Sequence, residues 1–213
     1  YLDELHFLSV ADTSARINAL LAKQVTVAPP MSAATIRTLD SYPDVKPFVS
    51  DTAHAIELVM ASRRAPVTDV RIRQAMRLVV DRQEMIDQAV SGYGVIGNDL
   101  MCPADPMFAR DLPQRTQDID KAKFLLKQAG VENLSITLET ASITPGAAES
   151  AQIFARQAKL AGIDVKVNNS TPDNYFSATG PFQNTPFFSS EDGDFTIDQC
   201  YAQLLGLSCI DEH

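Results

Sequence analysis

Basic residues are scarce in this sequence, and they stop early. The 213 residues contain 18 Lys and Arg against 27 Asp and Glu, which gives a net charge of −9, and no Lys or Arg follows Lys166. Binding to DNA, RNA or anionic lipid without sequence preference requires a positive surface. The composition therefore argues against a polyanion-binding protein, and we expect no nucleic-acid partner.

Motifs for metal, cofactor and nucleophile chemistry are missing as well. The cysteines Cys102, Cys200 and Cys209 form no CxxC pair, and the three histidines form no HxxxH or HExxH pattern. There is no Gly-rich phosphate loop and no GxSxG turn. A Cys200–Cys209 bridge is compatible with an oxidising compartment, although an odd cysteine count indicates no disulfide framework. We therefore expect no cofactor, no metal site and no enzyme; a carboxylate-based hydrolase is a less favoured alternative.

Long apolar runs are absent too. No stretch approaches the roughly 18 apolar residues that a membrane span needs, yet 45% of the residues are hydrophobic. That fraction is ordinary for a folded globular chain. The chain opens on "YLDELHFLSVAD", without an initiator Met or a signal peptide, and stops at "GLSCIDEH". We expect it to be part of a longer protein.

The four arginines of residues 67–94 are balanced by acids. The window "VTDVRIRQAMRLVVDRQEMIDQAVSGYG" predicts one helix from Asp69 to about residue 80 and a second from Asp81 to Gly92. Asp69/Arg73 and Arg77/Asp81 stand four apart, where opposite charges are neighbours on a helix. Because positive and negative charges cancel in this window, we interpret it as structural scaffold and not as a phosphate-binding surface.

The remaining pattern predicts an α/β fold. Residues 134–140, 145–162 and 163–167 read as strand, helix and strand, which makes a βαβ unit with parallel strands. We expect a mixed sheet flanked by helices. Further strands are predicted at 4–10, 25–29, 45–50, 54–62 and 185–190, and further helices at 12–23, 32–40, 118–130, 171–179 and 196–206.

Acids and aromatics gather near the end of the chain, in "PFFSSEDGDFTIDQCY" (186–201). Carboxylates beside aromatic faces can bind a protonated amine through charge and cation–π contact. A solvated acidic surface and ordinary core packing are the competing interpretations. The candidate ligand-binding residues are Glu191, Asp192, Asp194, Asp198, Phe188 and Phe195.

The arginine-bearing window resembles the stretch by which family 5 extracellular solute-binding proteins are recognised. Their typical pattern is Asp-Val-Arg-x-Arg-x-Ala, then Asp-Arg/Lys-x-x-Ile, then Gly-x-Gly. "DIDKAKFLLKQAGV" (118–131) and "AESAQIFARQAKLAGIDVKV" (148–167) resemble further helices and a strand of the family. The resemblance covers about residues 1–178, with Gln24 and Thr26 where Gly and Asp are common.

The resemblance implies a periplasmic-binding-protein-like fold with two lobes that close on a ligand. Residues 1–57 would end lobe I, 58–190 would form most of lobe II, and 191–213 would be an acidic, truncated C-terminal segment. The family implies an aspartate that pairs with the ligand's amino group, which falls among the acids of 191–198. It also implies a chain more than twice this length, so part of the cavity would be missing here.

The function that the resemblance implies is the substrate-binding component of an ABC importer. It would capture a short peptide by lobe closure and deliver it to a membrane permease, in a bacterial periplasm or at the cell surface. Nickel, another metal chelate, a sugar or an opine-like solute are alternatives, as is a protein-interaction module. Surface left uncovered by the absent lobe could also cause homo-oligomers to form.

Overall fold

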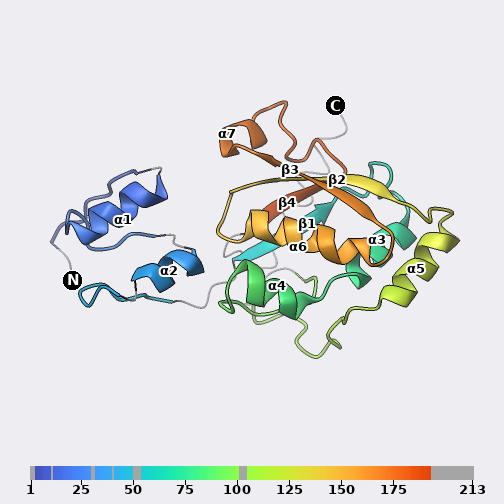
Figure 1. The fold of residues 1–213 in the computed structure, drawn as a ribbon, viewed down its shortest axis with the longest axis horizontal. Helices are drawn as coiled ribbons and strands as arrows, with labels where there is room; N and C mark the ends of the chain where they lie inside the picture. Colours follow the sequence, from blue (N-terminus) through green and yellow to red (C-terminus); the bar gives the residue numbers. More distant parts are fainter. Residues whose placement is uncertain are drawn as a thin grey trace. The chain divides into compact units, whose positions relative to one another are not determined.

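The chain divides into two compact units, Tyr1–Val49 (unit 1) and Ser50–His213 (unit 2). The computed structural model describes residues 3–10, 12–29, 32–39, 41–49, 54–100 and 105–192 (Figure 1). Residues 55–60 form a strand that pairs within unit 2, and the division into lobes at residue 58 stays a prediction.

Unit 1 contributes two short helices, α1 (Thr13–Leu21) and α2 (Ala33–Leu39). Asp12 caps α1 by accepting a 2.8 Å hydrogen bond from the Ala15 amide, as the sequence predicts. The Ser32 hydroxyl accepts at 3.2 Å from the amide of Thr35 near the start of α2. Both helices were therefore predicted correctly from their starting residues.

The strands predicted for unit 1 were wrong. The described parts of 4–10, 25–29 and 45–50 contain no strand. A strand needs a neighbour for its backbone hydrogen bonds, and the described residues of unit 1 supply none. Instead, the first of these segments exposes its large side chains, with Phe7 90% exposed.

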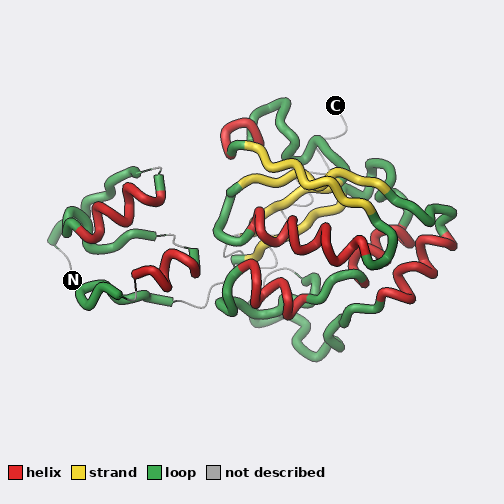
Figure 2. Tube along the Cα trace, in the orientation of Figure 1, coloured by secondary structure: helices red, strands yellow, loops and turns green. Residues whose placement is uncertain are grey.

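Unit 2 is built on a four-stranded mixed sheet in the order β1-β4-β2-β3 (Figure 2). β2 runs parallel to both β3 and β4, and β1 runs antiparallel to β4. The predicted mixed sheet with a βαβ unit is thereby confirmed, and the strands predicted at 54–62 and 185–190 are β1 and β4. The strand bounds are β1 (Ala55–Met60), β2 (Ser135–Ala141), β3 (Asp164–Ser170) and β4 (Phe187–Asp192).

In the described residues five helices accompany this sheet; the helix predicted at 196–206 lies outside them. α6 forms the crossover from β2 to β3 and lies across one face of the sheet (Figure 1). Asp69, Asp81 and Asp118 cap α3, α4 and α5 through their side chains. The helix bounds are α3 (Val70–Leu78), α4 (Arg82–Ala89), α5 (Ile119–Gln128), α6 (Ala147–Lys159) and α7 (Pro172–Tyr175).

The main core lies between α6 and the sheet, with α3 and α5 beside them. Residues of β2 alternate between buried and exposed, and Ile136 and Leu138 point into this core. Phe154 of α6 meets Phe187 of β4 edge to face, with ring centroids 5.2 Å apart. From α3, Met76 joins the same cluster. This arrangement gives unit 2 a contiguous apolar interior of its own.

A smaller cluster covers the opposite face of the sheet. Tyr175 and Phe188 are buried there, and Phe182 packs against them. The Tyr175 hydroxyl donates a 2.6 Å hydrogen bond to the carbonyl of Ser189. Burial raises the pKa of Tyr175 well above its usual value, so the phenol stays protonated and holds α7 against β4.

The arginines of α3 bind backbone and neighbouring acids. Arg71 pairs with Asp69 at 2.5 Å and also donates to the carbonyl of Gln128. Arg73, which was predicted to pair with Asp69, donates instead to the carbonyls of Val67 and Thr68, at 2.7 and 2.9 Å. A side chain that satisfies two carbonyls locks the turn before the helix, which supports the interpretation of this window as scaffold.

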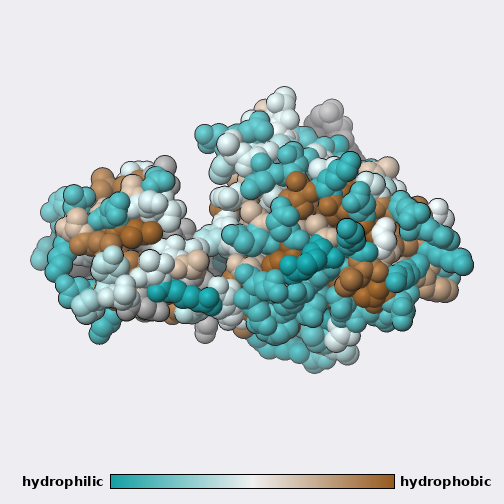
Figure 3. All heavy atoms as spheres, viewed as in Figure 1, coloured by the Kyte–Doolittle hydropathy of each residue, from teal (hydrophilic) through white to brown (hydrophobic). Residues whose placement is uncertain are grey.

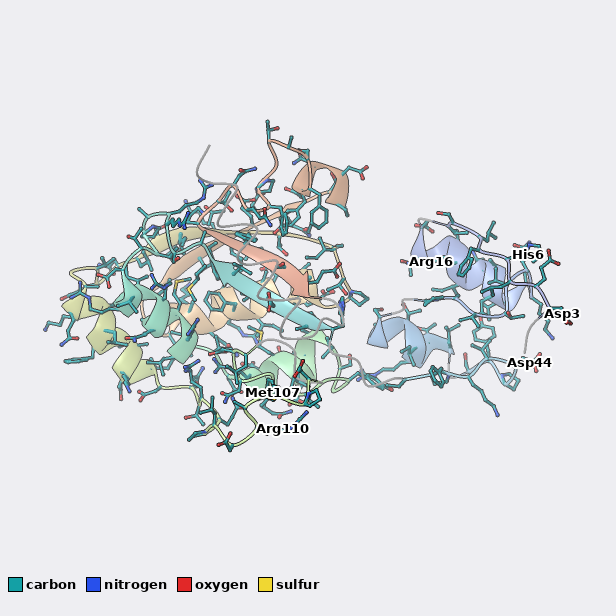
Figure 4. All side chains as sticks on the ribbon, turned by 180° about the vertical axis from the view of Figure 1, so that it is seen from behind. Asp3, His6, Arg16, Asp44, Met107 and Arg110 are labelled. Carbon is teal, nitrogen blue, oxygen red and sulfur yellow. The ribbon has the colours of Figure 1, made fainter. Side chains whose placement is uncertain are left out.

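Arg82 likewise binds backbone carbonyls and a neighbouring acid, at the junction of α3 and α4. Its side chain is 11% exposed. The guanidinium group donates to both carboxylate oxygens of Asp99, at 2.6 and 2.8 Å, and to the carbonyls of Val80 and Arg115. Planar guanidinium groups suit such multiple contacts. The long segment between α4 and α5, in which Figure 4 labels Met107 and Arg110, is tied to the helices through this arginine.

The predicted capping box of α4 is only half present. Asp81 accepts from the amide of Glu84 as expected, but the amide of Asp81 is bound by Gln157 of α6 at 3.1 Å. The Glu84 carboxylate turns outward to Gln157 and Arg156, at 2.6 and 2.7 Å. A tertiary contact has replaced the local one, and it joins α4 to α6.

Candidate functional site at the carboxyl edge of the sheet

The parallel strands of unit 2 end at one edge, which we call the carboxyl edge. β2 ends at Ala141 and β4 at Asp192, and they are neighbours in the sheet. The crossover after β2 leads to β3 on one side, whereas β4 lies on the other side. Ligands of open α/β sheets bind outside the carboxyl ends of strands, at such a change in direction. This edge is therefore the candidate site.

Three side chains from separate segments meet at this edge. The Nε2 atom of His54, directly before β1, lies 3.3 Å from Oε2 of Glu191 and 3.1 Å from Oγ1 of Thr144. The side chains of His54 and Glu191 are 39% and 38% exposed. The two side chains therefore contact one another and are still open to solvent.

The turn that carries Thr144 is positioned by a glycine. Gly146 has a φ of 95°, and a Cβ there would lie 2.7 Å from Cγ1 of Val90 and 3.1 Å from the carbonyl of Ala89. Only glycine fits this close approach to the end of α4. The turn then closes when the Ala147 amide donates to the carbonyl of Thr144 at 3.2 Å. Thr144 is thus fixed beside His54 by packing.

The predicted site residues divide between the two faces of the sheet. Phe187 faces the α6 side and Phe188 the opposite side, so alternation places Glu191 on the α6 side. Phe188 is 5% exposed and packs edge to face on Phe182, with centroids 5.5 Å apart. Phe188 and Glu191 therefore lie on opposite faces of β4, and the role of each in ligand binding stays a prediction.

The structure describes the other predicted site residues less fully. Asp192 is the last residue of β4 and is in register with Ala55. Asp194, Asp198 and Phe195, as well as all three cysteines, lie outside the described residues. Their roles therefore stay predictions.

Sequence reasoning missed His54 and Thr144 as members of this site. Neither stands in a recognisable motif, and both are far from Glu191 in the chain. The register of β1 with β4, which pairs Ile56 with Glu191, brings His54 to the same edge and face. No local pattern encodes a pairing between strands so distant in sequence.

Two hollows among the described residues lie away from this edge. One is an open groove of about 330 Å³ at the amino ends of β2 and β3, lined by Lys123, Lys127 and Glu132 among others. The other has a volume of about 60 Å³, lies in unit 1 and is lined by Arg16, which is labelled in Figure 4, among others. We favour the carboxyl edge because side chains from three separate segments meet there and because ligands of open α/β sheets bind outside the carboxyl ends of the strands.

Within the described ranges, no three His, Cys, Asp or Glu side chains come together as a metal site. Nor does any helix of those ranges have the length and apolar character of a membrane span; α6, with 13 residues, is the longest of them.

Known proteins match this chain in sequence and in fold. In sequence it is 26% identical over 171 residues to the dipeptide-binding protein of Escherichia coli, a match that covers 78% of this chain and 32% of that protein. It is also 28% identical over 82 residues to the nickel-binding periplasmic protein of the same organism, covering 38% and 16%. The chain thus spans about a third or less of these relatives.

Solved structures share the fold at low identity. NikZ from Campylobacter jejuni, in complex with Ni(L-His), superposes with a TM-score of 0.75 at 16% identity, over 86% of this chain and 38% of that one. DppA from Helicobacter pylori, in complex with the peptide STSA, gives 0.72 at 19%, over 87% and 36%. The model of the bacterial extracellular solute-binding proteins, family 5, matches residues 1–202. The chain belongs to the bacterial extracellular solute-binding proteins of family 5.

Proposed function

We propose that this chain is part of the substrate-binding component of an ABC importer, and that the intact protein captures a short peptide. Unit 2 forms most of lobe II and unit 1 ends lobe I, and closure of the two lobes encloses the solute. The intact protein then delivers the solute to a membrane permease from the periplasm or the outer cell surface. It performs no chemistry on the solute.

The observation that carries this proposal is the half-exposed Glu191 carboxylate at the carboxyl edge. It stands at the end of β4, and the chain continues from there into Asp192, Asp194 and Asp198. A protonated amino terminus is a cation that such carboxylates bind through charge-assisted hydrogen bonds. The printed names of the dipeptide-binding relative and of the peptide-bound DppA support the same solute class.

Calorimetry with the full-length protein tests the proposal. The probes are a panel of dipeptides and tripeptides with free amino termini, each with its N-acetylated counterpart. We expect binding to the free-amine peptides and a loss of about tenfold or more on N-acetylation, because a hydrogen bond to a charged group contributes about 1.5–3 kcal/mol. If no member of the panel binds, the assignment to peptides is wrong.

A nickel chelate is the second candidate. It is favoured by the nickel-binding relative and by the Ni(L-His) complex of NikZ. Titration of the same protein with Ni(II) in the presence of L-histidine separates the two, since a peptide binder gives no heat there and a chelate binder gives none with the peptide panel.

A further inference from the structure

We propose that His54 is the residue that positions the Glu191 carboxylate for the solute's amino group. This inference rests on the proposed function and deepens it. It assigns a role to a side chain before β1 that belongs to none of the recognised motifs, and it predicts selectivity for solutes with a free amine.

The contact between His54 and Glu191 indicates which atom carries the hydrogen. A carboxylate only accepts hydrogen bonds, so a favourable contact of 3.3 Å between Nε2 of His54 and Oε2 of Glu191 requires that Nε2 carry hydrogen. This N–H is shared between the contact with Glu191 and the hydrogen bond with Oγ1 of Thr144, which is 3.1 Å long. Thr144 therefore acts as a second acceptor that keeps the imidazole in place.

The contact with His54 gives the two carboxylate oxygens of Glu191 different roles. Within the described part of the chain, His54 holds Glu191 through Oε2. The other oxygen, Oε1, then accepts from the solute. Because a free glutamate side chain has many rotamers, fixing it in advance lowers the entropy that binding would otherwise cost.

Three segments of the fold hold His54, Glu191 and Thr144 in place. His54 leads directly into β1, Glu191 is held in β4 opposite Ile56, and Thr144 sits in the turn that Gly146 closes. A second His–Glu pair shows the contrast. His6 and Glu4 of unit 1 are 3.2 Å apart but 82% and 75% exposed, in a segment without regular structure (Figure 4). That pair provides a matched control.

The test compares variants of the full-length protein. The probes are the tightest-binding free-amine dipeptide of the panel described above and its N-acetyl derivative. We expect His54→Ala to weaken the free-amine dipeptide about three- to tenfold, which is the range for loss of one ordered side chain. Binding of the N-acetyl dipeptide, which lacks the ammonium group, stays unchanged.

Rescue distinguishes positioning from general support of the fold. His54→Gln places an amide donor near the position of Nε2, so we expect affinity within about twofold of wild type. His54→Asn has the same chemistry but is too short, so it should behave like His54→Ala and replaces that variant if it fails to fold. His6→Ala should leave both affinities unchanged.

Three results would overturn the inference. They are equal losses for the two dipeptides, an unchanged free-amine affinity in His54→Ala, and no recovery in His54→Gln. Each differs from failure of the proposed function, which would show as a wild-type protein that binds no peptide and would remove this inference with it.

Discussion

Both units carry hydrophobic residues, yet among the described residues the clusters of buried hydrophobic side chains lie in unit 2. In unit 1 the described residues bury Ala19 and Leu39, whereas Phe7 and Phe48 are 90% and 93% exposed. In unit 2 the sheet, α3, α5 and α6 enclose a contiguous apolar cluster. Figure 3 shows hydrophobic atoms on the visible surface of both units. A helix can therefore form from a local hydrophobic pattern, whereas a strand or a core also needs other segments of the chain to pair with or pack against.

The largest expected effect tests whether the core is confined to unit 2. Phe154 is 3% exposed and packs on Phe187. Phe154→Ala should lower the free energy of unfolding by about 3–5 kcal/mol, because it removes buried surface and leaves a cavity. Urea denaturation of the 213-residue chain measures it. Phe7→Ala is the control and should change stability by less than about 0.5 kcal/mol; a similar cost in both would show a core in unit 1.

The next test concerns the contact that joins α4 to α6. Gln157 is 2% exposed and binds both the amide and the carbonyl of Asp81. Gln157→Leu should cost about 2 kcal/mol, since two backbone groups lose their partner. Arg156→Ala, which removes a neighbouring 56% exposed arginine from the same Glu84, should cost less than about 1 kcal/mol. Equal losses in denaturation would contradict the role given to Gln157.

Features that depend on neighbouring residues could be predicted from the sequence, whereas features that depend on distant segments could not. Helix starts were predictable because an aspartate cap and its amide partner lie within three residues, as at Asp12 and Asp118. The βαβ unit was predictable because its handedness and lengths are local rules. Strand order was not, and neither was the meeting of His54 with Glu191, because both depend on the pairing of distant strands.

The half-formed capping box shows where local rules fail. The spacing of Asp81 and Glu84 satisfies the local motif, but Gln157 offers the amide of Asp81 a buried partner that Glu84 cannot match. A buried amide that gains a full hydrogen bond is worth more than an exposed local one. Tertiary packing therefore decides among local options that are individually allowed.

Removal of a helix cap should have a smaller effect on stability, and the effect should differ between the two units. Asp12 and Asp118 accept from amides three residues on, at 2.8 and 2.9 Å. Asp118→Ala should lower the unfolding free energy of unit 2 by about 1 kcal/mol. Asp12→Ala should leave that transition unchanged and reduce only the helical signal of unit 1, followed by circular dichroism. A shared loss in one transition would show that the two units unfold together.

The smallest effect is a pH dependence confined to the start of α3. The hydrogen bonds that Arg71 donates to Asp69 lower the pKa of Asp69 from 3.8 to about 2. A carboxyl group whose pKa is lower in the folded state stabilises the fold above its unfolded pKa, and this contribution disappears as the pH falls towards the folded value. Asp69→Asn keeps the helix cap but removes the titration. The difference in melting temperature between wild type and Asp69→Asn should therefore be constant above about pH 5 and shrink between about pH 4 and 2. If the difference stays the same down to pH 2, then the pairing of Asp69 with Arg71 contributes nothing that depends on charge, and the arginine acts only through its bond to the carbonyl of Gln128.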